Sequence, residues 1–162
     1  MPAAWDSIYA LSESLGNVLS QIQAQLASAE SCTGGGIGYA ITQTPGSSEW
    51  YAGGINAYSN EVKQNLLGVD SLIIQEQGAV NERVVAQMAA GAARNLDTQV
   101  ALATSGIAGP GGGSENKPIG TVCFAWQIFD QNLTETKLFS GDREAVRLKS
   151  IEYSLRRLIE LL

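Results

Sequence analysis

The chain has 162 residues, of which 44% are hydrophobic and 16% are charged, and its formal net charge at pH 7 is −6. That length suits one domain with a proper core, so we treat residues 1–162 as a single domain. The net charge argues against a nucleic-acid-binding surface, which needs clustered lysine and arginine, and no apolar run approaches the about 20 residues of a membrane span.

The N-terminal part of the chain predicts a helix, a short strand and a second helix. Apolar residues recur at spacings of three and four, as on one face of an amphipathic helix. These residues are Ile8, Leu11, Leu15, Val18, Leu19, Ile22 and Leu26. A strand is expected at about residues 25–29, ending at Glu30 and Ser31. The glycines that follow open a helix that runs to about Gln43.

The rest of the chain alternates between strands and helices. Asn60 is expected to cap a short helix that carries Lys63 and ends at Gly68. Asn81 caps a longer helix. The other expected elements are strands over 51–58, 100–104, 122–128 and 134–139, a loop rich in glycine and proline over 106–118, and a helix from Asp142 onward. This alternation, closed by one hairpin, predicts an α/β fold in which helices cover both faces of a mixed sheet.

Residues 29–35 read Ala-Glu-Ser-Cys-Thr-Gly-Gly, in a chain that contains no histidine. Ser31 lies where a strand ends and a helix begins, and ligands of α/β sheets bind at strand ends. A helix N-terminus there offers unpaired backbone N–H groups, which can hold a phosphate or an oxyanion. Without histidine, a catalytic serine must be deprotonated by a lysine, a tyrosine or a carboxylate. The alternative is that Ser31 or Thr33 only caps the helix.

Cys32 is a second candidate nucleophile beside Ser31, because a thiolate is intrinsically better than an alkoxide. A catalytic cysteine needs a histidine or another cation to lower its pKa, so we interpret Cys32 as a buried small residue. Cys32 and Cys123 belong to no cysteine-dense framework. We therefore expect two reduced thiols in a cytoplasmic protein.

Other familiar site patterns are absent or incomplete. Residues 34–39 fail the G-x-G-x-x-G spacing, and there is no P-loop sequence. Tyr58 and Lys63 are one residue too far apart for the Tyr-x-x-x-Lys pair of short-chain dehydrogenases. Because histidine is absent and the carboxylates are dispersed, we expect no metal. The basic residues near the C-terminus, among them Arg143 and Arg147, are interpreted as the solvated face of a helix.

Residues 106–114 read Gly-Ile-Ala-Gly-Pro-Gly-Gly-Gly-Ser, directly after a buried strand. So many glycines let the backbone pass close to a ligand and turn its N–H groups inward as an anion nest. A flexible surface loop is the alternative, but such a loop has little use for Pro110 and Pro118. We therefore favour a ligand-binding loop.

Seven segments, in chain order, resemble one known family. They are Ala-Glu-Ser-Cys-Thr-Gly-Gly at 29–35, Pro-Gly-Ser-Ser at 45–48, Tyr-Ser-Asn-Glu-Val-Lys at 58–63, Gly-Ala-Val at 78–80, Ser-Gly-Ile-Ala-Gly-Pro-Gly-Gly-Gly at 105–113, Lys-Pro-Ile-Gly-Thr-Val at 117–122 and Phe-Ser-Gly-Asp-Arg at 139–143. This sequence resembles the C-terminal domain family of the competence/damage-inducible protein CinA, whose stand-alone members are nicotinamide mononucleotide deamidases. The resemblance covers nearly the whole chain, and its two departures, Gly36 and Asn81, lie outside the chemistry.

The resemblance implies a three-layer α/β/α domain that hydrolyses the carboxamide of nicotinamide mononucleotide. The products would be nicotinate mononucleotide and ammonia, in pyridine-nucleotide (NAD) recycling. The resemblance also implies a serine nucleophile at Ser31, with Lys63 and Tyr58 beside it. The family's active-site motifs contain three further residues, Ser48, Ser105 and Arg143.

A serine–lysine amidase agrees with both the residues and the resemblance. Ser31 would attack the amide carbon, Lys63 would take its proton, and water would release the acyl-enzyme without a metal or organic cofactor. Burial must lower the Lys63 pKa for this role, and a solvated helix lysine is the alternative. The expected oxyanion or substrate-binding residues are Cys32, Thr33, Gly34, Ser48, Ser105, Gly106, Gly109, Gly111, Gly112 and Arg143.

Two other functions stay open at this point. One is a non-catalytic module that senses a nucleotide or binds a partner, whose sign would be the loss of Ser31 or Lys63; both are present. The other is an amidase for another small carboxamide, because specificity depends on the shape of the pocket. We also expect a homo-oligomer, with a dimer favoured, and neither a nucleic-acid nor a membrane partner.

Overall fold

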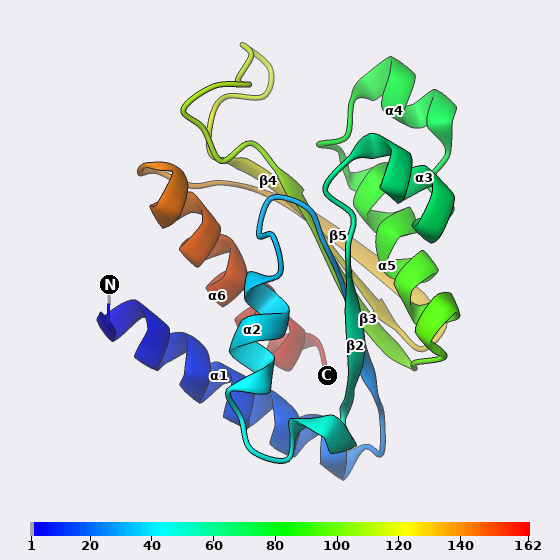
Figure 1. Cartoon of the computed structure of the whole chain (residues 1–162), viewed down its shortest axis with the longest axis vertical. Coiled ribbons are helices and arrows are strands. Elements are labelled where there is room, and N and C mark those ends of the chain that lie inside the picture. Colours follow the sequence, from blue (N-terminus) through cyan, green and yellow to red (C-terminus); the bar gives the residue numbers. More distant parts are fainter. Residues whose placement is uncertain (1) are drawn as a thin grey trace.

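The computed structural model describes residues 2–162 and forms one mixed sheet with helices on both sides (Figure 1). The helices in that range are α1 (Pro2–Gln21), α2 (Gly36–Thr42), α3 (Asn60–Leu67), α4 (Ser71–Gln77), α5 (Glu82–Leu96) and α6 (Arg143–Leu161), with a 3-10 turn at Ser47–Glu49. The strands are β1 (Leu26–Glu30), β2 (Tyr51–Asn56), β3 (Val100–Gly106), β4 (Thr121–Ile128) and β5 (Gln131–Leu138). Within this part of the chain, no helix is both long and apolar enough to cross a membrane.

The five strands have the order β2-β1-β3-β4-β5. β1 is parallel to both β2 and β3, whereas β4 and β5 continue the sheet as antiparallel neighbours. At the carboxyl end of β1, Glu30 pairs with Asn56 of β2 and with Thr104 of β3. The chain leaves β1 toward one neighbour and later returns to its other side. The carboxyl end of β1 is therefore a topological switch point, where α/β sheets bind ligands.

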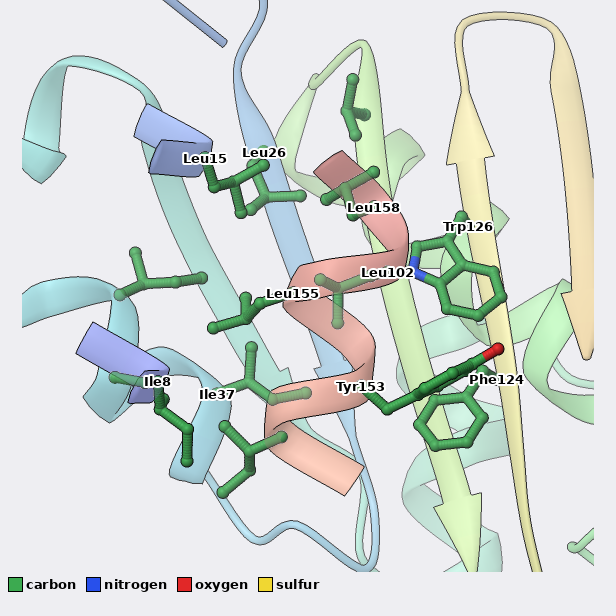
Figure 2. Packing of buried hydrophobic residues seen from close by; sticks show 14 of the residues in the cluster. Ile8, Leu15, Leu26, Ile37, Leu102, Phe124, Trp126, Tyr153, Leu155 and Leu158 are labelled. Atoms are coloured by element: carbon green, nitrogen blue, oxygen red, sulfur yellow. The ribbon is translucent and has the colours of Figure 1, made fainter. Parts of the chain in front are cut away.

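The sheet separates two apolar cores. Helices α1, α2 and α6 cover one face and α3, α4 and α5 cover the other (Figure 1). On the first side, Phe124 and Trp126 of β4 stack on each other, and Phe124 also packs against Tyr153 of α6 (Figure 2). On the second side, small residues such as Ala27 and Ala101 let α5 lie close to the sheet. This arrangement confirms the predicted three-layer α/β/α fold with a mixed sheet.

Several element boundaries differ from the prediction. Leu26 belongs to β1 rather than to the first helix, which ends at Gln21, so its match to the apolar spacing is accidental. Ser59, not Asn60, caps α3, because its side chain accepts a hydrogen bond from the Val62 N–H. Helix α4 was not predicted; it is a single seven-residue segment, too short to show a clear period.

Candidate active site

Ser31 begins a tight turn, which we call the serine turn (residues 31–36), at the carboxyl end of β1. The side chain is 8% exposed, and its backbone N–H donates to the carbonyl of Thr104 in β3 at 3.0 Å. The serine lines a cavity of about 270 Å³. The cavity's other lining residues include Cys32, Tyr58, Lys63, Ser105, Gly106 and Arg143.

Lys63 lies in α3, in the helix layer on one face of the sheet, and its side chain meets Ser31 in this cavity. It sits one turn into α3, where its backbone N–H donates to the carbonyl of Ser59. The side chain is 1% exposed, and its Nζ lies 2.9 Å from Ser31 Oγ and 3.2 Å from the carbonyl oxygen of Tyr58. Burial lowers the pKa of Lys63, because the ammonium loses its hydration. The pair thus has the geometry of a hydroxyl beside an amine base.

Tyr58 contacts Lys63 through its backbone rather than through its phenol. The side chain is 63% exposed, and its hydroxyl accepts a hydrogen bond from Nη2 of Arg143 at 3.2 Å. The other guanidinium nitrogen, Nη1, donates to the carbonyl of Gly109 at 2.7 Å. Arg143 therefore joins Tyr58 to the loop after β3 at the rim of the cavity.

Cys32 lies beside Ser31 but is a poor nucleophile. Its side chain is 7% exposed, and burial raises the pKa of the thiol to about 12. A thiol of that pKa is protonated near neutral pH, and the thiolate is the reactive form. Cys32 and Cys123 are both buried and free, as predicted.

Directly after Ser31, two consecutive N–H groups of the serine turn, those of Cys32 and Thr33, have no acceptor in the described part of the chain. The N–H of Gly34 is not one of them, because it donates to the carbonyl of Ser31 at 3.0 Å. Among residues 2–162, no other residue accepts a hydrogen bond from the N–H of Cys32 or of Thr33. Of these two residues, Cys32 lines the cavity, whereas Thr33 is fully buried and does not. The Cys32 N–H, next to the nucleophile, is therefore the candidate donor to an oxyanion.

Glu30 closes the N-terminus of α2, which the sequence analysis expected to be open to a ligand. The carboxylate is 2% exposed and accepts from the N–H groups of Ile37, at 2.8 Å, and Gly38, at 3.1 Å. Burial raises the pKa of Glu30, and these hydrogen bonds partly oppose that shift. The helix end is consequently occupied by the chain itself, and the free donors lie earlier, in the serine turn.

The loop after β3, residues 107–120, is called the glycine loop below. Ser105 and Gly106 at the end of β3 line the cavity, and the Ser105 hydroxyl donates to the carbonyl of Ala79 at 3.0 Å. Gly111 and Gly112 are exposed beyond the cavity. Gly112 lines a neighbouring hollow of about 370 Å³, which shares Ala79 and Val80 with the cavity at Ser31.

Two predicted site residues do not reach the cavity with their side chains. Ser48 is exposed in the 3-10 turn that precedes β2. Because β1 and β2 are parallel, that turn lies at the amino ends of the strands, whereas Ser31 lies at their carboxyl ends. The structure therefore corrects the placement of Ser48 in the site. Thr33 is fully buried, its hydroxyl bonds to that of Thr104 at 2.9 Å, and it does not line the cavity.

The sequence analysis missed two residues that hold the serine turn. One is Glu30, whose signal was a carboxylate directly before Ser31 at the end of an apolar strand. The other is Arg147, which donates from Nε to the carbonyl of Cys32 at 3.1 Å and from Nη2 to that of Thr33 at 3.3 Å. Its spacing of four residues from Arg143 puts both on one face of α6. Arg143 is exposed, as expected for a solvated basic face, but Arg147 is half-buried against the serine turn.

A larger hollow, of about 800 Å³, lies between α1 and residues 43–50. Its ionised lining groups in the described part of the chain are the carboxylates of Asp6, Glu13 and Glu49. That charge does not suit an anionic ligand, and the hollow contains neither member of the Ser31–Lys63 pair. Across residues 2–162, no cluster of three or more acidic or cysteine side chains is placed to hold a metal ion.

Two relatives of the same name are similar to this chain over nearly its whole length. A nicotinamide-nucleotide amidohydrolase PncC of Pseudomonas putida is 45% identical over 156 residues, covering 96% of this chain and 98% of that protein. The protein of the same name in Escherichia coli K12 is also 45% identical, over 149 residues, covering 91% of this chain and 90% of its own length.

Solved structures give the same result for the fold. The crystal structure of a CinA superfamily protein from Escherichia coli superposes with a TM-score of 0.93 at 36% identity, covering 96% of this chain and 90% of that one. A competence/damage-inducible protein from Agrobacterium tumefaciens gives a TM-score of 0.92 at 34% identity, covering 96% and 95%. The sequence model of the CinA C-terminal domain family matches residues 8–162 of this chain. The chain belongs to the CinA C-terminal domain family.

Proposed function

We propose that this chain hydrolyses the carboxamide of nicotinamide mononucleotide, with Ser31 as the nucleophile and Lys63 as its base. The observation that carries the proposal is the 2.9 Å separation between Lys63 Nζ and Ser31 Oγ, two buried side chains that both line the cavity. The names of the relatives, which are similar over nearly their whole length, support the substrate.

In the first half of the reaction, Ser31 Oγ attacks the amide carbon while the neutral amine of Lys63 takes the hydroxyl proton. The free N–H of Cys32, which lines the cavity, donates to the oxyanion. The Lys63 ammonium then protonates the leaving nitrogen, so that ammonia departs and an ester on Ser31 remains. The fall in the Lys63 pKa on burial favours the neutral amine from which this sequence starts.

In the second half, water attacks the ester while Lys63 takes its proton, and Lys63 then returns this proton to Ser31 Oγ as the ester bond breaks and nicotinate mononucleotide leaves. One amide and one water thus give one acid and one ammonia. No step needs a metal or an organic cofactor. Arg143 is the other cation in the cavity lining, and Lys117 lines the neighbouring hollow, which shares Ala79 and Val80 with the cavity. We therefore expect the phosphoribosyl group to bind on this side.

An ammonia-release assay tests the proposal with a panel of carboxamides. Nicotinamide mononucleotide, the riboside without phosphate and free nicotinamide differ only in the phosphoribosyl part. The proposal expects the mononucleotide to have the highest kcat/KM. A higher kcat/KM for an unphosphorylated carboxamide would favour an amidase of other specificity, and no ammonia from any would favour a non-catalytic nucleotide-binding module.

The proposal includes the setting in which the enzyme works. The product is a pyridine nucleotide, so we assign the reaction to the recycling of NAD precursors. The two free thiols suit the reducing cytoplasm. A homodimer is the expected state, which sedimentation equilibrium would measure.

A further inference from the structure

The cavity at Ser31 is small for a whole nucleotide. Its volume is about 270 Å³, whereas binding sites for small molecules measure about 300–1,000 Å³. The adjoining hollow of about 370 Å³, which we call the Lys117 hollow, shares Ala79 and Val80 with this cavity. With the carboxamide at Ser31, the phosphate at the far end of the substrate therefore has room beyond the shared wall.

The charge of the Lys117 hollow suits a phosphate. Within the described residues, its lining contains one ionised side chain, that of Lys117, and no carboxylate. The chain as a whole carries a net charge of −6, and the larger hollow beside α1 is lined by three carboxylates, those of Asp6, Glu13 and Glu49. An anionic ligand is therefore attracted to the Lys117 hollow and repelled from the hollow beside α1.

The side chain of Lys117 is held at its base and at its tip. At the base, the Lys117 N–H donates to Ser114 Oγ at 3.1 Å, and the Lys117 carbonyl accepts from the Ser114 N–H at 2.8 Å. At the tip, Nζ donates to the carbonyl of Gln77, the last residue of α4, at 2.6 Å. An ammonium has three N–H donors, so two remain for a ligand.

Backbone N–H groups add to this cation. The N–H groups of Ala79, Val80 and Gly112 have no acceptor among residues 2–162, and all three residues line the hollow. Gly112 has a φ of +89°, a backbone conformation that favours glycine, so the chain at this point has no side chain between it and a ligand. Free N–H groups beside a cation are the donors with which proteins bind phosphate.

Arg143, the cation that lines the Ser31 cavity, is engaged at the rim. Its Nη1 donates to the carbonyl of Gly109 at 2.7 Å, and its Nη2 donates to the hydroxyl of Tyr58 at 3.2 Å. These bonds join the start of α6 to the glycine loop and to Tyr58. Arg143 thus has a task in holding the rim, whereas Lys117 has donors to spare.

From these observations we propose that the phosphate of the substrate binds in the Lys117 hollow, and that Lys117 determines the preference for a phosphorylated carboxamide. This inference rests on the proposed function, because it assigns one part of the same substrate. The phosphate takes no part in the changes at the amide. Its contacts with Lys117 therefore act mainly on KM.

The test measures kcat/KM on nicotinamide mononucleotide and on nicotinamide riboside, which lacks the phosphate. Lys149→Met is the matched control for Lys117→Met, because Lys149 is also half-buried and donates from Nζ to a backbone carbonyl at 2.6 Å, away from both sites. We expect Lys117→Met to lose about tenfold to a hundredfold in kcat/KM on the mononucleotide, mainly through KM, and to stay within about threefold on the riboside. Lys117→Arg keeps the cation and should lose less, and Lys149→Met should keep wild-type values on both substrates.

Three outcomes would overturn the inference. One is an equal loss on both substrates, which would give Lys117 a structural role only. Another is an unchanged kcat/KM of Lys117→Met on the mononucleotide. The third is a loss confined to the mononucleotide in Arg143→Met but absent in Lys117→Met. If Lys117→Met fails to fold, Lys117→Gln, whose neutral amide can still donate to the Gln77 carbonyl, is judged by the same criteria.

A binding measurement separates this inference from the proposed function. Ribose 5-phosphate carries the sugar and the phosphate without the carboxamide, and calorimetry gives its dissociation constant beside that of ribose. If the wild type releases no ammonia from any carboxamide, the proposed function fails, but ribose 5-phosphate should still bind about tenfold or more weakly to Lys117→Met than to the wild type. Equal dissociation constants for the two proteins, or no binding to the wild type, would contradict a phosphate site in the Lys117 hollow.

Discussion

The serine turn and the glycine loop follow neighbouring parallel strands and are both rich in glycine, yet they are built differently. The serine turn is tied by its own backbone, by Glu30 and by Arg147, and Ser31 within it is buried. The glycine loop is closed at its base, where Gly120 donates to Ile107 at 2.7 Å, but residues 110–116 are exposed. Close packing requires glycine at Gly36 in the turn and at Gly120 at the base of the loop, whereas Gly111 in the exposed part of the loop has open space around it.

This contrast assigns different tasks to the two segments. A nucleophile and its oxyanion donors must be held within a fraction of an ångström, and a tied turn does this. A loop that covers the sugar and phosphate of a substrate can order on binding. Substitutions in the turn should therefore lower kcat, and those in the loop should mainly raise KM.

The largest effect is expected for Ser31→Ala. Removing a nucleophile costs several powers of ten in kcat, so ammonia release should fall by more than about a thousandfold while the protein stays folded. Cys32→Ala is the matched control in the next position and should be mild. A Ser31→Ala enzyme with more than about a tenth of wild-type kcat would exclude the serine mechanism, and an inactive but folded Cys32→Ala enzyme would move the nucleophile to the thiol.

A similarly large loss is expected for Lys63→Arg and Lys63→Met together. Arginine keeps the charge but stays protonated, because its pKa is above about 12. Methionine keeps the length and removes the base. If Lys63 only bound the phosphate, the arginine variant would retain activity and the methionine variant would mainly raise KM. An active Lys63→Arg enzyme with an unshifted pH profile therefore contradicts its role as base.

A smaller and more direct test of the contrast compares Gly34→Ala with Gly111→Ala. Gly34 has a left-handed backbone, which costs an alanine about 1–2 kcal/mol, and the added methyl meets Arg147. Gly111 has open space around its Cβ position, so alanine there should change stability by less than about 1 kcal/mol. Urea unfolding and kinetics should show lower stability and kcat for the first variant only. Equal effects would remove the distinction between turn and loop.

The smallest expected effect is on the pH dependence of stability. Because the folded pKa of Lys63 is below its unfolded value, the unfolded state binds more protons in the window between them. The free energy of unfolding of the wild type should therefore rise with pH across that window, and this contribution should be level at pH values below the folded pKa. Lys63→Met should lack this contribution and gain stability relative to wild type at lower pH. Parallel wild-type and variant curves in urea titrations would mean that the Lys63 pKa is not lowered.

Much of this organisation follows from local sequence. The alternation of apolar patterns predicted the layers, and the caps Asn81 and Asp142 begin their helices as expected. Ser31 and Lys63 were identified because the lack of histidine leaves few bases for a serine. Their separation of 2.9 Å was beyond the sequence, since it depends on how α3 packs against α5 and so brings Lys63 to the carboxyl end of β1.

The misplaced and missed residues share one physical cause. Ser48 was assigned to the site from a motif, but parallel strands bring together their carboxyl ends, and Ser48 precedes its strand. The role of Arg147 depends on contacts between segments more than a hundred residues apart, which no local pattern encodes. In the sequence, Glu30 is the last residue of a strand, and nothing local indicates that its carboxylate accepts hydrogen bonds from the N-terminus of α2.

The most direct test of the central claim is an NMR titration of the Lys63 side chain beside the kcat/KM profile. Lysines labelled with ¹³C at Cε report each ammonium separately, and Lys63→Met identifies the signal. The account predicts that Lys63 titrates below the ordinary lysine pKa of about 10.4, and that kcat/KM rises with pH at the same midpoint. A Lys63 that titrates at the ordinary value, or a kinetic midpoint that differs from it, would contradict Lys63 as the base for Ser31.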